Sequence, residues 1–411
     1  MRKYAKDKRP SQKPVIKAEL AEGNKTKRII FIAIFLAIGI SLIAFSAVKL
    51  LGRERGFTEV SIDSPFSDFF VMNYDIGASG AVASAEYRRV KEVYSDALEK
   101  YCKLYSSDTD YESVVNICYI NSHPGEKITL DPELYSVLQR MEREGDSRHY
   151  LGIVLEMYDV LFSCDGDGYA KDADPMKNAE LNAIALEACA FAADKSAISL
   201  QFFDDSSIML HVSDEYRAFA QVNGLSRFID LGIFENAFVV DSVADTLLRE
   251  KLEFGSISSY DGYARNLDTR EGARYSFSYY AKSGNAVYPV CDVSYEGAIS
   301  TCVLKSYPTT ELDVFDFYLY SDGSSAHMLI DKNTAAARTA VPELLLASGS
   351  EDTVALALRG YSALVSDVLN TSALDGVFAA WLDGYTVKSM NSDGITLSDP
   401  FVSEQISFVI E

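Results

Sequence analysis

A run of twenty residues without a charged side chain, 29–48, divides this chain into a short basic part and a long acidic part. At ~1.5 Å per residue, a helix of this length spans a hydrocarbon layer of roughly 30 Å. Residues 1–28 hold ten Lys and Arg against three acids, a charge of +7, whereas the whole chain carries −22. The run therefore predicts a transmembrane helix, with a large folded domain only in the residues that follow it.

The charge asymmetry also predicts an orientation. Basic flanks stay in the cytoplasm, so we expect a single-pass protein of the cell membrane with a cytoplasmic N-terminus and an extracellular globular domain. An acidic exterior domain argues against a nucleic-acid partner. The alternative is a cleaved signal peptide, because Ala44-Phe-Ser46 is faintly similar to a cleavage site, although the basic region and the apolar run are both long for a signal.

Four segments follow from these features. They are a basic tail (1–28), a transmembrane helix (29–48), a juxtamembrane linker (49–68) and an exterior domain (69–411). The composition is 48% hydrophobic with 22 Phe and 25 Tyr, which is enough to build a sizeable core. Cys164 to Asn182 is polar and aperiodic, and predicts a surface loop; its aspartates lack the spacing of a calcium-binding EF-hand loop.

Residue spacing predicts both helices and strands in the exterior domain. Apolar residues recur at helical spacing from Glu86 to Tyr105, and Asp131 before Pro132 predicts the start of a second helix, which runs through Met141. Asn223-Gly224 predicts a tight turn between two strands. Alternating patterns predict further antiparallel strands over Arg274–Ala281, Val287–Leu304 and Val314–Tyr320.

The segment Asp230 to Asp241 is the strongest candidate for a binding site. It follows the predicted hairpin, and Val240, Val243 and Leu247 recur beyond it at helical spacing. Residues 230–237 should therefore form a strand-to-helix loop at a helix N-terminus, where free backbone N–H groups favour an anion such as a phosphate.

Asp367 and Thr371 form a second candidate site. Thr353 to Leu358 alternates as a strand would, and Ala363 to Leu374 predicts a helix that places Asp367 and Thr371 one turn apart on the same face. A carboxylate and a hydroxyl in this arrangement suit Mg²⁺, although a solvated pair is the commoner outcome of such spacing.

Six cysteines and four histidines limit other chemistry. No two cysteines form a C-x-x-C pair, so zinc-knuckle and thioredoxin-like sites are not supported. Cys291 and Cys302 lie symmetrically about Glu296-Gly297, so a hairpin there would place them opposite each other, either as a disulfide or as two buried thiols. His327 follows a polar turn and, taken alone, is most simply a surface residue.

The sequence Asp230-Leu-Gly-Ile-Phe-Glu-Asn-Ala-Phe-Val-Val-Asp241 resembles the signature of the FAD:protein FMN transferases, the ApbE family, which is approximately D-L-G-G-I-A-K-G-Y-A-V-D. Ile233, Asn236 and Ala237 replace a Gly, the Lys and another Gly. Weaker matches occur in the same order along the chain, at Val71-Met72-Asn73, Ser258-Ser-Tyr-Asp-Gly262, His327-Met-Leu-Ile-Asp331-Lys-Asn-Thr334 and Ser366-Asp-Val-Leu-Asn-Thr371.

The resemblance implies an α+β fold, a single ApbE-like domain of mixed sheets with flanking helices. It also implies FAD and Mg²⁺ as cofactors, and transfer of FMN from FAD to a Ser or Thr of an exported flavoprotein, the acceptor partner. His327 would then manage protons as the catalytic residue. The implied flavin and metal contacts are Met72, Asp230, Gly232, Asn236, Ser258 and Gly262 for FAD, and Asp367, Thr371 and the Glu235 carbonyl for magnesium. The alternative is an inactive membrane-anchored flavin-binding or interaction module of the same fold.

Overall fold

The computed structural model describes residues 56–283, 286–309, 312, 315–392, 394–401 and 408–410. Its central element is a nine-stranded sheet in the order β1-β2-β6-β7-β10-β13-β14-β15-β17, antiparallel except for the parallel β15–β17 pair. The strands are β1 Gly56–Glu59, β2 Phe70–Ile76, β6 Gly255–Ser259, β7 Tyr263–Asn266, β10 Ile299–Lys305, β13 Glu343–Ser348, β14 Phe378–Asp383, β15 Thr386–Met390 and β17 Val409–Ile410.

Strand β13 shows why the domain has three layers. Every residue of this strand is buried. Leu344 and Leu346 belong to one core cluster, whereas Leu345 and Ala347 belong to a second. Because successive side chains of a strand point to opposite faces, both faces of the sheet are covered, and a strand in that position must be apolar throughout.

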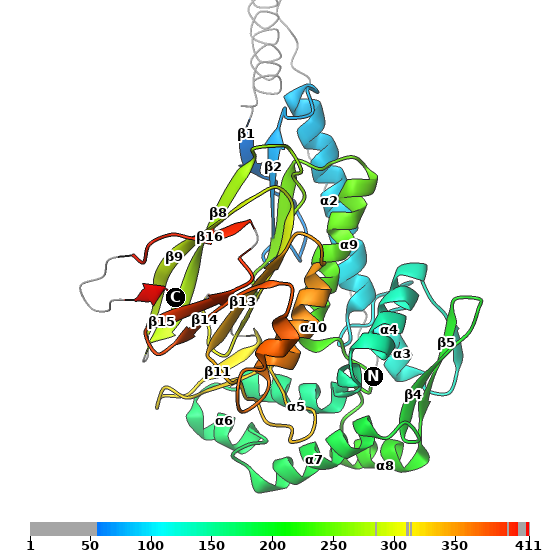
Figure 1. Ribbon diagram of the computed structural model, residues 1–411. Helices are drawn as coiled ribbons and strands as arrows, with labels where there is room; N and C mark the ends of the chain where they lie inside the picture. The colour runs from blue at the N-terminus through cyan, green and yellow to red at the C-terminus, as the bar shows by residue number, and fades with distance from the viewer. Residues whose placement is uncertain are drawn as a thin grey trace, which may run out of the picture. The chain divides into compact units, whose positions relative to one another are not determined.

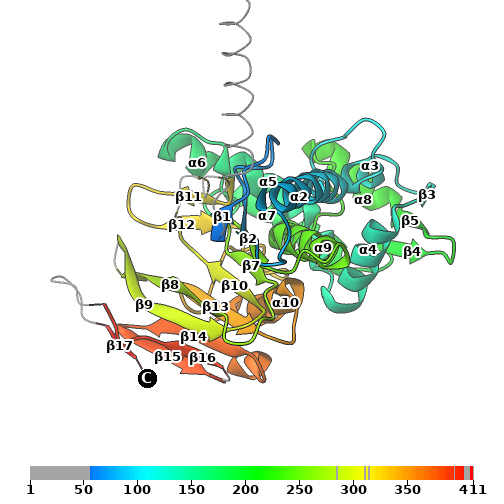
Figure 2. The same cartoon turned by 90° about the horizontal axis from the view of Figure 1, so that it is seen from above.

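Three helices cover one face of the sheet and a small sheet covers the other (Figures 1 and 2). The helices are α2 Ala83–Tyr105, α9 Glu235–Arg249 and α10 Thr353–Leu364. The small sheet has the order β16-β9-β8, with β8 Arg274–Ser283, β9 Ala286–Glu296 and β16 Ile395–Leu397. The second core cluster fills the space between the two sheets.

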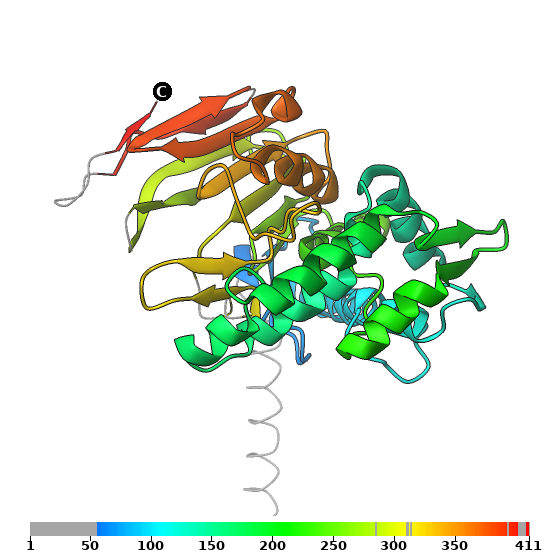
Figure 3. The same ribbon diagram turned by 90° about the horizontal axis from the view of Figure 1, so that it is seen from below.

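A helical lobe lies beside the layers and is seen from below in Figure 3. It contains α3 Ile117–Ser122, α4 Pro132–Glu144, α5 Gly152–Phe162, α6 Asp167–Ala173, α7 Ala179–Ala193 and α8 Asp214–Asn223, with the three-stranded sheet β3 Lys127–Thr129, β5 Ser207–Val212 and β4 Ile198–Phe202. A two-stranded sheet, β11 Phe317–Leu319 and β12 Ser325–His327, lies near α5 and α6.

Two helices predicted from spacing are confirmed. Helix α2 covers the predicted Glu86–Tyr105 and buries the expected stripe, including Val90, Tyr94 and Tyr101. Helix α4 begins at Pro132, and the Asp131 side chain accepts a hydrogen bond from the Glu133 N–H at 2.9 Å. The apolar period is enough to define α2, whose N-cap residue Val82 forms no side-chain hydrogen bond, and a side-chain cap adds to the apolar period in α4.

The predicted hairpin around Asn223-Gly224 is wrong. Asp214–Asn223 is helix α8, and Gly224 ends it with a positive φ of 69°. Asn-Gly accepts positive φ in a type I′ turn and equally at a helix C-terminus, so the dipeptide does not distinguish the two. Burial of Tyr216 and Ala220 on one helical face decides in favour of the helix.

The predicted hairpin between Cys291 and Cys302 is also wrong. Cys291 lies in β9 and is paired in register with Tyr279 of β8, whereas Cys302 lies in β10 of the large sheet. The chain changes sheets at Gly297, so the two thiols belong to different core clusters. All six cysteines are free thiols, and the disulfide alternative is excluded by this geometry.

Two segments also differ from the sequence predictions, and two others are not described by the structure. Strand β1 already pairs with β2, so the sheet begins inside the predicted linker 49–68 and upstream of residue 69. Helices α6 and α7 occupy much of Cys164–Asn182, which was predicted to be a loop. No helix in the described ranges is long and apolar enough to cross a membrane, and the predicted tail 1–28 and transmembrane helix 29–48 lie outside those ranges.

Candidate functional site

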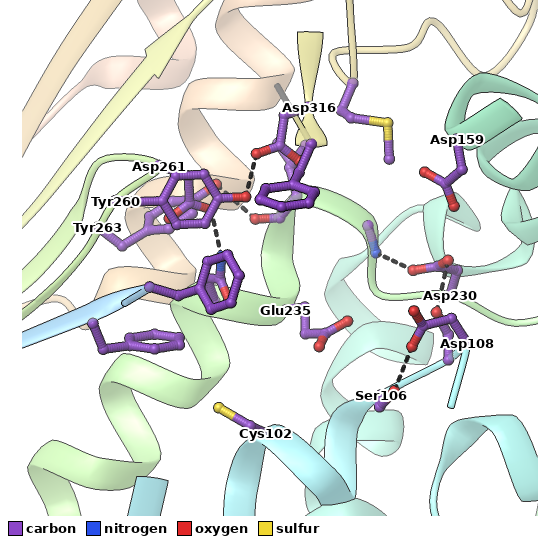
Figure 4. Close-up of a pocket in the computed structure, with 18 of the residues that line it drawn as sticks. Cys102, Ser106, Asp108, Asp159, Asp230, Glu235, Tyr260, Asp261, Tyr263 and Asp316 are labelled. Atoms are coloured by element: carbon purple, nitrogen blue, oxygen red, sulfur yellow. Dashed lines mark hydrogen bonds between the residues drawn. The ribbon is translucent and has the colours of Figure 1, made fainter. Parts of the chain in front are cut away.

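A cavity of about 370 Å³ opens where the loop before α9 meets the β6–β7 turn, the end of α2 and strand β11. Figure 4 shows carboxyl groups approaching it from several elements: Asp108 after α2, Asp159 on α5, Asp230 and Glu235 around the start of α9, and Asp261 in the β6–β7 turn. We refer to this space as the acidic cavity.

Asp230 fixes the loop before α9. Its Oδ1 accepts a hydrogen bond from the Gly232 N–H at 2.6 Å, and its Oδ2 accepts bonds from Ser107 Oγ at 2.9 Å and Arg227 Nη1 at 3.0 Å. Gly232 has a positive φ of 55°, which suits the tight return of the backbone. The Asp230 carboxylate therefore occupies one of the N–H groups of the 230–237 loop, which were predicted to favour an anion.

Further amides of this loop also have partners within the chain. The Asp230 N–H donates to His149 O at 2.9 Å, the Phe234 N–H donates to Leu231 O at 3.1 Å, and the Glu235 N–H donates to Gly232 O. The loop is at a helix start, as predicted, and a short 3₁₀ turn, Gly232–Phe234, already uses several of the N–H groups that were expected to face a ligand.

Asn121 holds the segment that leads into the loop. Its Nδ2 donates to Ile229 O and its Oδ1 accepts from the Ile229 N–H, both at 2.8 Å. The buried amide thus pairs with the Ile229 backbone as a neighbouring strand would, and satisfies both groups. The position of Asp230 at the cavity wall follows from this fixed backbone.

Glu235 and Asp261 face the cavity from opposite elements. Asp261 Oδ2 accepts a hydrogen bond from Asn236 Nδ2 at 3.0 Å, and Ser259 Oγ donates to the other oxygen. Burial raises the pKa of Asp261 to about 6. Burial, reinforced by the charges of Asp230 and Asp108, also raises the pKa of Glu235 well above its usual range.

Aromatic side chains form much of the remaining wall. The Phe69 ring lies 5.6 Å from the rings of Tyr260 and Phe315, and the Phe66 ring lies 6.5 Å from that of Tyr111. The aromatic residues that line the cavity are Phe66, Phe69, Phe70, Tyr111, Tyr260, Tyr263, Phe315 and Phe317. Several of these rings tilt or meet edge to face, an arrangement that leaves ring faces available to a ligand.

Carboxyl groups outnumber cations around the cavity. Among its described lining residues there are six acids, Asp108, Asp159, Asp230, Glu235, Asp261 and Asp316, and two cations, Arg227 and Lys305. Arg227 lies between Asp159 and Asp230, and Lys305 Nζ donates to Thr309 Oγ1. Both cations are therefore already engaged within the chain.

The cavity brings together only part of the site predicted from sequence. Asp230, Gly232, Glu235 and Asn236 line it. The other three predicted flavin contacts, Met72, Ser258 and Gly262, are not among its lining residues. Met72 is a buried residue of β2, Ser258 pairs with Val71 in the sheet, and Gly262 approaches the backbone of Val303.

His327 has a different environment from the one its sequence suggests. It is 4% exposed, at the end of β12, and its Nδ1 accepts a hydrogen bond from the Leu329 N–H at 3.3 Å. Burial lowers its pKa to about 4, so the imidazole is neutral at pH 7. Met328 and Leu329 line the cavity, but His327 does not. Its catalytic role stays a prediction.

The helical spacing behind the predicted magnesium site is absent. Thr353–Leu364 is helix α10, not a strand, and it ends three residues before Asp367; Thr371 begins a separate 3₁₀ turn. The Asp367 carboxylate is 88% exposed and pairs with Arg338 at 3.0 Å. Neither residue lines the cavity that Glu235 faces, and no group of three His, Cys, Asp or Glu in the described ranges is arranged to hold a metal.

The sequence analysis missed several cavity residues. Arg227 and Asp159 are far apart in the chain and meet only because α5 packs beside the Asp230 loop. Asp261 lies inside the segment Ser258–Gly262, but a single carboxylate in a turn has no spacing that distinguishes it from a solvated one. Arg227 lies three residues before Asp230, and that short spacing is the one local signal that could have identified it.

Comparison with solved structures identifies the architecture. The ApbE protein from Thermotoga maritima matches with a TM-score of 0.54 at 16% sequence identity, over 79% of this chain and 94% of that one. The fold is ApbE-like. The flavin transferase ApbE from Vibrio cholerae and a mutant of it match at 11% identity, with TM-scores of 0.46 and 0.49, over 83% and 84% of this chain and 97% of each of theirs. The sequence matches no protein-family profile and no curated protein.

Proposed function

We propose that this chain is a small-molecule-binding protein built on the ApbE-like fold, and that it does not transfer FMN. One observation carries the proposal: the residues predicted to perform transfer are not at the cavity. His327, Asp367 and Thr371 all lie outside its lining, whereas the loop containing Asp230 and Glu235 forms part of its wall. A metal-assisted transfer needs these groups around one substrate phosphate.

The cavity residues alone do not fit the diphosphate of FAD. The Gly232 amide that would hold a phosphate already binds the Asp230 carboxylate. Arg227 and Lys305 are engaged within the chain, so the described lining offers excess negative charge to an anionic ligand. Like charges placed close together in a partly buried site repel strongly, so a diphosphate would be disfavoured.

Flavin transfer is the second candidate function, and one observation favours it. Four residues of the resemblance, Asp230, Gly232, Glu235 and Asn236, do line the cavity of an ApbE-like fold. In such a transfer the acceptor hydroxyl oxygen forms a bond to the FMN phosphorus, the bond from that phosphorus to the bridging oxygen breaks, and AMP leaves while the hydroxyl proton passes to a base.

The proposal includes attachment to the cell membrane. It rests on the uncharged run 29–48 and on the basic residues that precede it. The N-terminus would be cytoplasmic and the domain extracellular, close to exported partner proteins. Labelling of an introduced cysteine at residue 10 or at residue 410 with a membrane-impermeant reagent in intact cells tests the orientation, in a chain whose partly exposed Cys118 and Cys164 are replaced by serine. Labelling above that of the same chain without an introduced cysteine is expected at 410 and not at 10.

AMP release separates the two functions. The purified chain, in mild detergent, would be incubated with FAD and Mg²⁺, and AMP and FMN would be measured by chromatography. We expect no release above that of heat-denatured protein. Release that is abolished by Asp367→Ala but retained by Asp375→Ala, another exposed carboxylate, would instead establish metal-dependent transfer and overturn the proposal.

A further inference from the structure

Glu235 is the least satisfied charged group at the acidic cavity. It retains accessible surface because it faces the cavity, while protein atoms otherwise surround its carboxyl group. Its carboxyl group makes no hydrogen bond to another described residue, and Figure 4 shows Glu235 between Asp108 and Asp230 on one side and Tyr260 and Asp261 on the other. A carboxylate removed from water without a partner is costly, so a ligand that supplies a donor or a positive charge would be strongly favoured.

The aromatic wall narrows the chemistry of that ligand. Phe69, Tyr260 and Phe315 form one cluster of rings, in which the Phe69 ring centroid lies 5.6 Å from the centroids of both Tyr260 and Phe315. The negative face of such a ring attracts a cation, and its area favours a flat apolar group. A volume of about 370 Å³ accommodates a small organic molecule.

We propose that the acidic cavity binds an aromatic amine in its protonated form, with the ammonium group on Glu235 and Asp261 and the ring against the Phe69–Tyr260–Phe315 cluster. The inference rests on the proposed binding function and names its ligand class. The described lining has more carboxyl groups than cations, which disfavours an anionic dinucleotide and favours a cationic ligand.

Because the pKa values of the cavity carboxyl groups are raised, amine binding should change the number of protons that these groups hold. Glu235 and Asp261 hold protons more tightly than ordinary carboxyl groups because of burial. A bound ammonium group favours their ionised forms, so binding should release protons and strengthen as the pH rises through about 6. A ligand held only by apolar contacts would show neither effect.

Calorimetric titration of the full chain in mild detergent tests the proposal. The probes are 2-phenylethylamine, its neutral analogue 2-phenylethanol and its anionic analogue 3-phenylpropanoate. We expect the amine to bind at least about tenfold more tightly than the alcohol and the anion not to bind. Repeating the titration in two buffers of different ionisation enthalpy should show proton release.

Matched variants assign the contacts. Glu235→Gln keeps the side-chain shape and should weaken amine binding about tenfold. Phe315→Leu, at an exposed position, should weaken amine binding less. The control, Glu250→Gln at an exposed ion pair with Arg89, should leave amine binding unchanged. Equal affinity for amine and alcohol, or no loss in Glu235→Gln, would overturn the inference. AMP release from FAD is a separate readout, so failure of the proposed function is distinguished from failure of this ligand assignment.

Discussion

At the scale of single residues, the role of Asp230 in the structure differs from the role predicted from the sequence. In the sequence it begins a candidate phosphate loop; in the fold its side chain is 5% exposed and accepts three hydrogen bonds. We expect Asp230→Ala to lower the free energy of unfolding by about 3–5 kcal/mol, because Arg227 loses its buried partner and keeps only the partly exposed Asp159, and the Gly232 N–H loses its acceptor. Urea denaturation followed by circular dichroism measures this loss.

Asp367→Ala is the matched control for that measurement. Its carboxylate also pairs with an arginine, Arg338, but is 88% exposed. Exposed ion pairs are screened by water, so the free energy of unfolding should stay within about 0.5 kcal/mol of the wild-type value. Similar losses in the two variants would show that the Asp230 network is not buried as the structure has it.

At the scale of elements, the β6–β7 turn holds the cavity wall through a close backbone contact. Gly262 has a φ of 111°, its carbonyl accepts the Val303 N–H at 2.9 Å, and an added Cβ would lie 2.5 Å from Val303 O. We expect Gly262→Ala to lower the free energy of unfolding by about 3 kcal/mol and to displace Asp261, weakening any ligand held there. Thermal unfolding and the amine titration provide the two readouts.

Gly224→Ala tests the same kind of backbone strain without the steric contact. Gly224 also has positive φ, at the end of α8, but nothing lies within 4 Å of an added Cβ. A loss of about 1 kcal/mol is expected, with ligand binding unchanged. If Gly262→Ala cost no more than this control, the close approach of the turn to β10 would not be a determinant of the site.

Elements were predictable where local signals agreed. Helix α2 has a long apolar period, and α4 combines an apolar period with a capped start, so the identities of both helices follow from local sequence. The predictions of a hairpin at Asn223-Gly224 and of a strand at residues 353–358 were wrong, because positive φ and short apolar runs are compatible with more than one kind of element. In the site, the Asp230 loop could be predicted because it is one continuous segment. Asp159, Asp261 and the aromatic wall are brought to this loop by the packing of distant segments, and sequence spacing does not show that packing.

At the scale of the whole molecule, buried carboxyl groups make stability depend on pH. Glu343 in β13 is fully buried, accepts a hydrogen bond from the Tyr279 hydroxyl of β8 at 3.1 Å, and so links the two sheets. Burial raises its pKa to about 7. The folded state therefore binds a proton that the unfolded state releases near pH 4.5, so this contribution to stability is present below that pH and is lost as the pH rises through 7.

Glu343→Gln isolates that contribution, because glutamine stays neutral and can still accept the Tyr279 hydrogen bond. Relative to wild type, the variant should gain roughly 2–3 kcal/mol of unfolding free energy between about pH 5 and about pH 8, measured by urea denaturation at each pH. An equal pH dependence in the two proteins would contradict the assignment of the raised pKa to Glu343.

Surface charge acts in the same direction as Glu343, and salt separates the two effects. Residues 56–411 hold 25 Lys and Arg against 56 Asp and Glu, a net charge of −31, so self-repulsion also opposes folding at neutral pH. Repulsion between exposed charges is screened beyond a Debye length of ~10 Å at 0.1 M salt, whereas a carboxyl group buried between two sheets is screened much less. Raising sodium chloride from about 0.05 M to about 0.5 M at pH 8 should therefore stabilise wild type and Glu343→Gln equally and leave the difference between them intact. If salt removed that difference, the pH dependence would belong to the acidic surface of the domain and not to the buried carboxyl group that joins its sheets.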